Sequence, residues 1–311
     1  MASKKFSGII PVYKPKHKSS IAVVSAIKNI LSERYWNLKV GQSGTLDTAA
    51  EGLLIIGVGS DTSHLTHTLN FPKTYITRIN LGTMTDSLDT IGSIIAEKPY
   101  DHVTEEDVRK ILPQFLGTIS QTPPEFSSLK VYGVPASDLT RCGAQVTLTP
   151  RNVNVYNLDL VSFALPDITV KVNSGRGMYV RSLARDIAAA LGTVGHIKDL
   201  CRSTYGPFDV NSSRTLHFDD ISDDTLHNMI LPGEMLAAYA ENCEPLPPQG
   251  NARHSVVFPE TYGAGLQGNW ERKAMKLRKA VESRIAAMEE RMREENEEDY
   301  DDLYNKTPMK S

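Results

Sequence analysis

The loop at residues 41–54 combines glycines and small side chains with one carboxylate of catalytic interest, that of Asp47. Glycine lets the backbone approach a bound molecule closely. An apolar run at residues 53–58 follows directly, which ties the loop to a buried element. One acidic residue on a loop of a rigid scaffold suits a nucleophile better than a general acid/base pair. The same spacing also fits an ordinary Gly/Thr/Asp turn before a core strand, so spacing alone leaves both alternatives open.

The loop resembles the catalytic motif of the TruB family of pseudouridine synthases, G-H-x-G-T/A-L-D-x-x-A-x-G-x-L. Further blocks resemble family segments in the same order, and the resemblance runs over about residues 6–235. Several blocks in order are far more specific than one motif. The blocks are Pro72-Lys73-Thr74-Tyr75, Leu81-Gly82-x-x-Thr85-Asp86-x-x-Asp89, Pro123-Pro124-x-Phe126-Ser127-Ser128-Leu129-Lys130, Gly175-x-Gly177-x-Tyr179-x-Arg181-Ser182-Leu183 and Leu200-Cys201-Arg202-Ser203-x-x-Gly206-x-Phe208.

The resemblance implies catalysis without a cofactor. Pseudouridine formation breaks the N-glycosidic bond of a uridine, turns the uracil and rejoins it through carbon, with no metal, redox cofactor or ATP. Because the reacting atoms are unreachable in a stacked base, the uridine must be extruded. The implied catalytic residues are Asp47 as nucleophile, Arg181 as its charge partner and Tyr75 as the ring that stacks on the uracil. Arg185, one helical turn after Arg181, is the alternative partner.

The resemblance also implies a set of substrate-binding residues. Tyr179 and Leu200 are expected to line the pocket, although Leu200 fits a core position equally well. Phosphate contacts are expected from basic side chains. The candidates are Lys130, Arg202, Lys73 and Lys14. The scattered His64, His67 and His196 do not form a metal-binding set, so we expect no metal.

Three positions depart from the family pattern. Gln42 stands where the family usually has His, and its side chain cannot carry a charge. It is also predicted to be a substrate-binding residue. Phe126 replaces a Tyr and removes one hydroxyl. The segment 131–136 keeps the glycine but lacks the usual Lys and Tyr. None of these changes alters Asp47. We therefore expect them to affect RNA affinity or substrate specificity rather than the chemical step.

Composition is that of a globular protein without a disulfide framework. The chain has 311 residues and a net charge of −3, which argues mildly against nucleic-acid binding unless a local basic patch exists. Its three cysteines form no CxxC pair, which favours a reducing compartment. No apolar run approaches the ~20 residues that span a bilayer, and the first eight residues contain no signal-like apolar region. We expect no membrane association, a monomer, and a nuclear or cytoplasmic location, with a mitochondrial pool left open.

Several strand-like and helical segments must position these residues. Ser19 or Ser20 is expected to cap a helix to about residue 32, with Ile21, Val24, Ile27, Ile30 and Leu31 on one face. Residues 53–58 fit a buried helix or strand, and residues 75–81, 153–161 and 168–172 fit strands. Helices are expected at about residues 105–115, after a capping box, and at 178–191. This order predicts an α+β fold, and the resemblance implies a mixed, mostly antiparallel sheet with flanking helices and a central RNA-binding cleft.

The sequence divides into three segments by composition. Residues 1–235 are expected to form the catalytic domain. Residues 236–268 are rich in Pro and Gly and fit a linker. Residues 269–311 fit a charged helix with a disordered tail, either a solvated helix or a basic face that touches RNA. No β-rich stretch fits the PUA domain that bacterial and archaeal relatives carry here, so the chain looks like the shorter eukaryotic form.

The preferred function is that of a tRNA pseudouridine synthase acting on the T-loop uridine, position 55, with messenger RNA hairpins of similar shape as further substrates. The alternative is a non-catalytic RNA-binding or RNA-folding protein on the same fold. Retention of Asp47, Tyr75 and Arg181 favours the enzyme. A nucleotide-phosphate enzyme is disfavoured, because Gly57-Val58-Gly59-Ser60 lacks the lysine of a phosphate-binding loop.

Overall fold

The computed structural model describes residues 6–245, 247, 249, 254–260, 262, 263, 265–267 and 269–305, with side chains given up to residue 290. The chain forms two compact units. The sheet unit comprises the described residues within 1–122 and 150–251, and the insertion unit those within 123–149 and 252–311. The predicted tail beyond residue 305 lies outside the described residues.

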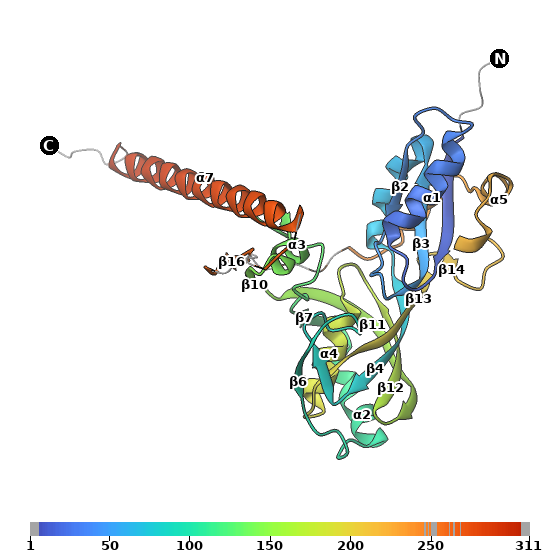
Figure 1. The fold of residues 1–311 in the computed structure, drawn as a ribbon, viewed down its shortest axis with the longest axis horizontal. Coiled ribbons are helices and arrows are strands. Elements are labelled where there is room, and N and C mark those ends of the chain that lie inside the picture. Colours follow the sequence, from blue (N-terminus) through green and yellow to red (C-terminus); the bar gives the residue numbers. More distant parts are fainter. Residues whose placement is uncertain are drawn as a thin grey trace. The chain divides into compact units, whose positions relative to one another are not determined.

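The sheet unit contains most of the strands and five α-helices of the described chain (Figure 1). Its strands are β1 (Gly8–Lys14), β2 (Val40–Ser43), β3 (Glu51–Val58), β4 (Lys73–Leu81), β5 (Thr83–Thr85), β6 (Ile94–Glu97), β7 (Gly117–Gln121), β11 (Arg151–Ala164), β12 (Asp167–Ser174), β13 (Gly195–Tyr205), β14 (Phe208–Asp209) and β15 (Leu216–His217). Its helices are α1 (Ser20–Ser32), α2 (Glu105–Ile111), α4 (Val180–Ala190), α5 (Asp223–Met229) and α6 (Glu234–Ala240), with 3₁₀ segments at Gly59–Asn70, Leu112–Phe115 and Phe218–Asp220.

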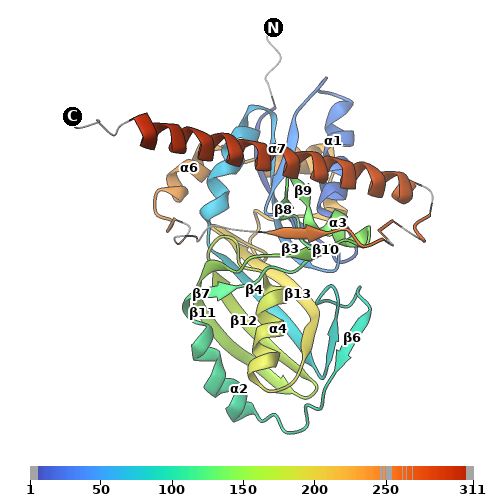
Figure 2. The same ribbon diagram turned by 90° about the vertical axis from the view of Figure 1, so that its left-hand side faces the viewer.

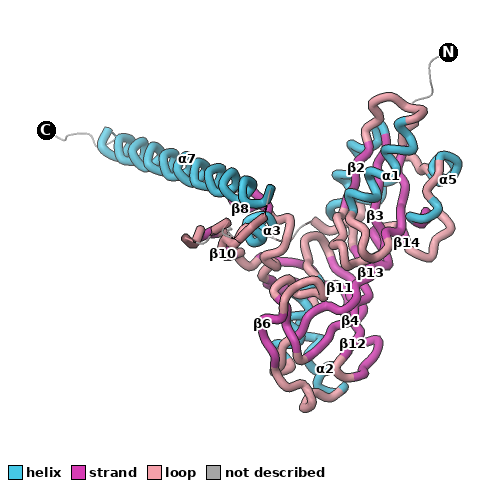
Figure 3. Tube along the Cα trace, viewed as in Figure 1, coloured by secondary structure: helices cyan, strands magenta, loops and turns pink. Residues whose placement is uncertain are grey.

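One ten-stranded sheet organises this unit, in the order β15-β1-β3-β13-β4-β12-β11-β7, with β14 paired to β13 and β2 to β3. The β1–β15 and β3–β13 pairs are parallel, and the other pairs of the sheet are antiparallel. Figure 3 shows its strands in magenta with helices on its faces. The predicted mixed, mostly antiparallel α+β fold is therefore confirmed.

Helix α1 covers the part of the sheet formed by β1 and β3. The side chain of Ser19 caps it by accepting a hydrogen bond from the Ala22 amide at 3.1 Å, as predicted. Its packed face is Val23, Ile27 and Leu31, at spacings of four residues. Ile21, which was predicted to lie on that face, is 70% exposed. Val24 and Ile30 are partly buried against the same cluster, so only Ile21 of the predicted face lies outside it.

Helix α4 covers the other part of the sheet, across β4 and β13 (Figure 2). Leu183 and Ile187 pack against buried residues of these strands. The helix is followed by Gly192 with φ of +77°, in agreement with the predicted glycine stop. The first turn of α4 contains Arg181, whose side chain reaches the loop between β2 and β3.

The apolar run at residues 53–58 is strand β3, which resolves the choice between helix and strand. It lies between β1 and β13 and is covered on both sides, by α1 on one and by Phe71 and Tyr205 on the other. A strand buried on both faces is continuously apolar rather than alternating. This is why its sequence pattern alone was ambiguous.

The insertion unit combines β8 (Lys130–Val131), β9 (Val134–Pro135), α3 (Ala136–Arg141) and β10 (Gln145–Thr147) with β16 (Ser255–Val257) and α7 (Asn269–Asn305). Strands β10 and β16 pair in antiparallel register. This division differs from the three predicted segments. Helix α6 overlaps the predicted linker, residues 236–268, and strand β16 lies within it. The charged helix α7 packs with the insertion. Composition could not reveal a partner so distant in sequence. Within the described residues, no helix is long and apolar enough to cross a bilayer.

Candidate active site

The loop that carries Asp47 connects β2 to β3 inside the sheet unit. Its C-terminal end needs glycine: Gly52 has φ of +110°, and a Cβ there would lie 2.3 Å from the Arg202 carbonyl oxygen on β13. Only glycine allows β3 and β13 to approach this closely. The loop therefore ends at a fixed point of the sheet while its middle remains at the surface.

The side chain of Ser20 holds the loop one residue before Asp47. Its Oγ accepts a hydrogen bond from the Leu46 amide at 2.9 Å and donates one to the Leu46 carbonyl at 3.0 Å. Ser20 is in the first turn of α1 and is 2% exposed. On the other side of Asp47, the His17 amide donates to the Thr48 carbonyl at 2.8 Å. The backbone around Asp47 is thus held by the segment that begins α1.

Two buried cations hold the ends of the same loop. The Arg202 guanidinium donates to the Gly44 carbonyl, and to the Leu53 carbonyl at 2.7 Å. The Lys14 ammonium donates to the Ala50 carbonyl. The sequence pattern did not indicate this role, because a basic residue that bonds backbone carbonyls looks the same in sequence as one that binds phosphate.

Asp47 pairs with Arg181. Arg181 Nε lies 2.8 Å from Asp47 Oδ2, and its Nη2 lies 3.3 Å from Oδ1. Its remaining nitrogen, Nη1, donates to the Ser87 carbonyl at 2.8 Å. The Arg181 side chain is 6% exposed, whereas that of Asp47 is 43% exposed. The carboxylate is therefore oriented by a buried cation and still open to an incoming molecule.

The alternative partner, Arg185, makes different contacts. Its Nη2 lies 2.8 Å from Asp186 and 3.3 Å from the Thr122 carbonyl. Both arginines lie on α4, one turn apart, but only Arg181 is at the end of the helix that meets the Asp47 loop. The structure thus distinguishes two residues that sequence spacing could not.

A pocket of about 110 Å³ opens beside Asp47. Tyr75 is almost fully buried in its wall, and burial raises the pKa of its hydroxyl, so this phenol stays protonated at neutral pH. The pocket brings together six predicted site residues. It is lined by Thr45, Leu46, Asp47, Tyr75, Met178, Tyr179, Val180, Arg181, Leu200 and Arg202.

Tyr179, directly before α4, is held from two directions. Its amide donates to Gln121 Oε1 at 2.8 Å, and its carbonyl accepts from Gln121 Nε2 at 3.2 Å. The Arg151 guanidinium lies 4.9 Å from the centre of its ring. The backbone and ring are both constrained, which suits a rigid wall.

The predicted phosphate contacts by Arg202, Lys73 and Lys14 are not supported. Arg202 is 2% exposed and Lys73 is 9% exposed, and Lys14 is fully buried. The Lys73 ammonium donates to the Phe71 carbonyl at 2.7 Å and lies 4.5 Å from the centre of the Tyr205 ring. These cations bond backbone carbonyls or lie over a ring inside the sheet unit, and their burial disfavours a contact with a phosphate at the surface.

The remaining predicted residues are not among those that line this pocket. Gln42 donates through Nε2 to Thr45 Oγ1 at 3.4 Å, next to the pocket, and its Oε1 is buried with no hydrogen-bond partner in the described part of the chain. Lys130 is exposed on β8 of the insertion unit. Phe126, in the same unit, lies with its ring 5.9 Å from the Arg141 guanidinium.

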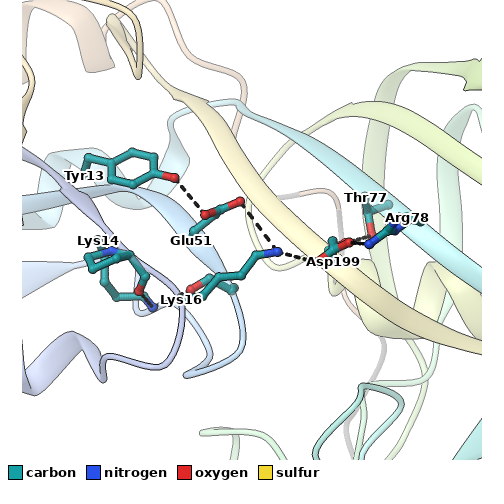
Figure 4. A network of polar contacts seen from close by, with 9 residues as sticks. Tyr13, Lys14, Lys16, Glu51, Thr77, Arg78 and Asp199 are labelled. Carbon is teal, nitrogen blue, oxygen red and sulfur yellow. Dashed lines mark hydrogen bonds and ion pairs between the residues drawn. The ribbon is translucent and has the colours of Figure 1, made fainter.

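A polar network that sequence analysis missed joins four strands next to the loop (Figure 4). Tyr13 on β1 donates to Glu51 on β3 at 2.8 Å, and Lys16 lies between Glu51 and Asp199 on β13. Asp199 also pairs with Arg78 on β4. Burial alone would raise the pKa of Asp199, but the hydrogen bonds and charges of Lys16 and Arg78 lower it below its ordinary value. Its carboxylate thus remains charged and links the two parts of the sheet.

Among the described residues, no group of three His, Cys, Asp or Glu side chains gathers as around a metal ion.

Replacing Ser20 with alanine is expected to reduce turnover by about tenfold to a hundredfold with little change in RNA affinity. The substitution leaves the Leu46 amide and carbonyl without their shared partner, so Asp47 is held less precisely, and small misplacements are costly in catalysis. Single-turnover rates and RNA affinity separate the two effects. Ser19→Ala is the matched control, since it removes the neighbouring hydroxyl and weakens only the helix cap. Equal rate losses in both variants, or no recovery in Ser20→Thr, would contradict a positioning role.

Replacing Lys73 with methionine is expected to stabilise the protein more at pH 6 than at pH 9. Burial, with a smaller contribution from the charge of Arg202, lowers the pKa of Lys73 from 10.5 to about 7. Below pH 7 the folded protein holds a buried ammonium at full cost. Between pH 7 and 10.5 only the unfolded chain binds that proton, so the cost falls as the pH rises. The difference in free energy of unfolding between variant and wild type should shrink by roughly 2 kcal/mol from pH 6 to pH 9, measured by urea denaturation. A difference independent of pH would contradict this assignment.

Two family models match the chain. One, described as TruB family pseudouridylate synthase (N terminal domain), matches residues 28–180, and the other, tRNA pseudouridylate synthase B C-terminal domain, matches residues 181–238. Among curated relatives, tRNA pseudouridine synthase B of Dehalococcoides mccartyi is 36% identical over 230 residues, 73% of this chain and 75% of the relative. Pseudouridylate synthase TRUB1 of Mus musculus is 41% identical over 215 residues, 65% of this chain and 64% of the relative. Its Homo sapiens counterpart is 37% identical over 247 residues, 74% of this chain and 71% of the relative.

Solved structures share the fold at lower identity. A chain of a Cbf5–Nop10–Gar1 complex has a TM-score of 0.57 and 24% identity, over 75% of this chain and 62% of that chain. An H/ACA RNP bound to a substrate RNA containing 2′-deoxyuridine gives a TM-score of 0.53 and 22% identity, over 75% of this chain and 61% of that chain. The chain therefore spans about six tenths of the length of each of these two structures, and the likeness concerns the fold.

Proposed function

This chain belongs to the TruB family of pseudouridylate synthases, and we propose that it converts the T-loop uridine of tRNA to pseudouridine. The choice of tRNA as the substrate is supported by relatives named tRNA pseudouridine synthase B. Messenger RNA hairpins that present a similar unpaired loop are proposed as further substrates, since such RNA is recognised by shape and by an extrudable base. We propose the nucleus or cytoplasm as the compartment, and a monomer as the active form.

One observation carries this proposal: an exposed carboxylate, oriented by a buried arginine, lies at the mouth of a pocket walled by an aromatic ring. Asp47 and Arg181 are 2.8 Å apart, and Tyr75 lies in the wall of the same pocket. A guanidinium that bonds both oxygens of a carboxylate fixes their orientation. An ionised, accessible Asp can attack a carbon centre, whereas a general acid/base pair would require a second titratable group at the same place.

In the proposed mechanism, the uridine is extruded from its loop and its uracil enters the pocket. Asp47 acts as the nucleophile in the step that breaks the bond between ribose C1′ and uracil N1, and the bond that its carboxylate forms is broken again before the product leaves. The detached uracil turns, C1′ bonds to C5, and the proton leaves C5 while N1 gains one, so no co-reactant is consumed. The pocket must hold the free uracil during this turn.

The roles of the pocket walls follow from their protonation and rigidity. Because Tyr75 remains a neutral phenol, it stacks on the uracil and donates a hydrogen bond better than it accepts a proton. Tyr179, held by Gln121 and Arg151, is proposed as a second wall and Leu200 as an apolar support. Gln42, beside Thr45 at the pocket, is proposed to contact the RNA.

We propose residues 1–235 as the catalytic domain, with its central part, 123–149, belonging to the insertion unit. The insertion carries Lys130, whose exposed ammonium is proposed to bind RNA phosphate. Lys130→Ala would then weaken RNA binding and reduce its dependence on salt.

Incubation of the purified protein with an unmodified tRNA transcript, without cofactors, tests this function. Carbodiimide-based mapping should detect one pseudouridine in the T-loop. Tight binding of the same tRNA without modification would instead support the alternative of a non-catalytic RNA-binding protein. If the protein neither modifies nor binds the transcript, tRNA is rejected as the substrate.

A further inference from the structure

The insertion unit owes its core to two segments that are far apart in the chain. Val131, Leu139 and Val146 of the insertion pack with Val281 of α7, which is fully buried. Lys273 pairs with Asp138 of α3 at 3.1 Å, which adds a polar contact between the same two segments. The first turns of α7 are therefore part of a folded unit and not a solvated helix on a linker.

These contacts define which face of α7 is packed. Ala274 and Val281 are buried, and Leu277 and Ile285 are partly buried against the same core. With a rotation of 100° per residue, a narrow stripe on the opposite face contains Arg272, Lys276 and Lys279, within about 60° of one another. We refer to these three residues as the basic stripe.

The basic stripe differs from the other basic residues of the helix. All three of its side chains are exposed, and within the described residues none has a carboxylate within ion-pair distance. Arg272 has one hydrogen bond, to Asn269 Oδ1 at 3.4 Å. In contrast, Arg278 pairs with Glu282 at 2.8 Å, and Arg284 donates to the Tyr132 carbonyl at 2.5 Å. Some cations of α7 are thus engaged by neighbouring groups, whereas the charges of the basic stripe are not neutralised by a carboxylate in the described part of the chain.

The charge of α7 reverses along its length. Residues 269–284 hold six Lys or Arg against two Glu, a net charge of +4, whereas residues 285–305 hold nine Asp or Glu against two Arg, a net charge of −7. A polyanion is attracted to the first part and repelled by the second. The basic stripe spans about 10 Å along the axis, which matches about three phosphates of one duplex strand.

We propose that the basic stripe is an RNA-binding surface that grips the phosphate backbone of the tRNA substrate. The partner is a nucleic-acid backbone because the stripe is compact, cationic and without ion pairs among the described residues, and its three positions carry no aromatic side chain that could read bases. The contact adds affinity without sequence information. This inference rests on the proposed function, since it takes tRNA as the polyanion.

The test replaces Arg272, Lys276 and Lys279 together with glutamine and measures Kd for an unmodified tRNA transcript at several salt concentrations. Affinity at about 0.1 M salt should fall at least tenfold, and the slope of log K against log salt should decrease by about two to three. The rate constant at saturating tRNA should stay within about twofold, because the stripe contributes binding and not chemistry. Unchanged thermal unfolding establishes that the insertion unit remains folded.

A matched variant removes the same net charge from the sheet unit, with Lys28, Lys39 and Lys110, all exposed, replaced by glutamine. An equal loss of affinity in this control would overturn the proposal, since net charge alone would then account for the effect. An unchanged Kd and salt slope in the stripe variant would overturn it as well. The proposed function fails separately, if the wild-type protein binds tRNA but forms no pseudouridine.

Discussion

Asp47→Asn is expected to lower the rate of pseudouridine formation by at least about 10⁴-fold while changing tRNA affinity by no more than about tenfold. The amide keeps the size and some hydrogen bonds of the carboxylate but is not a nucleophile. Asp47 is 43% exposed, its amide replacement can still accept a hydrogen bond from Arg181, and Arg181 also bonds the Ser87 carbonyl. The fold should therefore survive.

Single-turnover assays with excess enzyme, together with equilibrium binding, measure the two quantities. Glu51→Gln is the control, because it makes the same carboxylate-to-amide change four residues later, where the side chain contacts Tyr13 and Lys16 instead of the pocket. It should retain turnover within about tenfold. An Asp47→Asn protein with normal turnover would disprove the proposed mechanism.

Arg181→Met is expected to reduce turnover by about 10³-fold, with Arg185→Met close to wild type. Methionine fills much of the space of the buried arginine stem but removes the charge that orients Asp47. Arg185 is the matched control on the same helix, since it pairs with Asp186 and not with Asp47. Arg181→Lys should recover only part of the rate, because an ammonium cannot bond both Asp47 oxygens and the Ser87 carbonyl with the geometry of a guanidinium.

The split between rate and affinity in Arg181→Met gives a second readout. Loss of orientation at Asp47 should lower the single-turnover rate constant while Kd for tRNA stays within about tenfold. A merely structural role of Arg181 would weaken binding and lower thermal stability together with the rate. Equal effects of the two arginine substitutions would show that the pairing seen in the structure is not the one that matters in catalysis.

Local signals in the sequence determined several elements of the fold. The Ser19 cap, the Thr104 capping box and the glycine after α4 depend on hydrogen bonds and dihedral angles within a few residues. The alternation at residues 75–81 also appears as predicted in β4, with Tyr75, Thr77, Ile79 and Leu81 buried. These features do not require knowledge of the rest of the chain.

The motif order also indicated which residues to examine at the site. Asp47, Tyr75, Tyr179, Arg181 and Leu200 come from four separate segments, and the structure brings them to one pocket. The resemblance indicated Arg181, but helical spacing alone could not distinguish it from Arg185, since both lie on one face of a helix. That choice depends on where α4 begins relative to the Asp47 loop.

Only the tertiary structure decided what the buried cations do. Lys14, Lys73 and Arg202 carry the charges that RNA binding would require, and nothing local shows that they are enclosed. Arg202 is buried because β13 pairs with both β3 and β4, which places it opposite Gly52 and Tyr75 at once. The partnership between the insertion and α7 was hidden for the same reason. Both depend on pairing and packing between segments distant in sequence, whereas the capping, alternation and glycine signals act between neighbours.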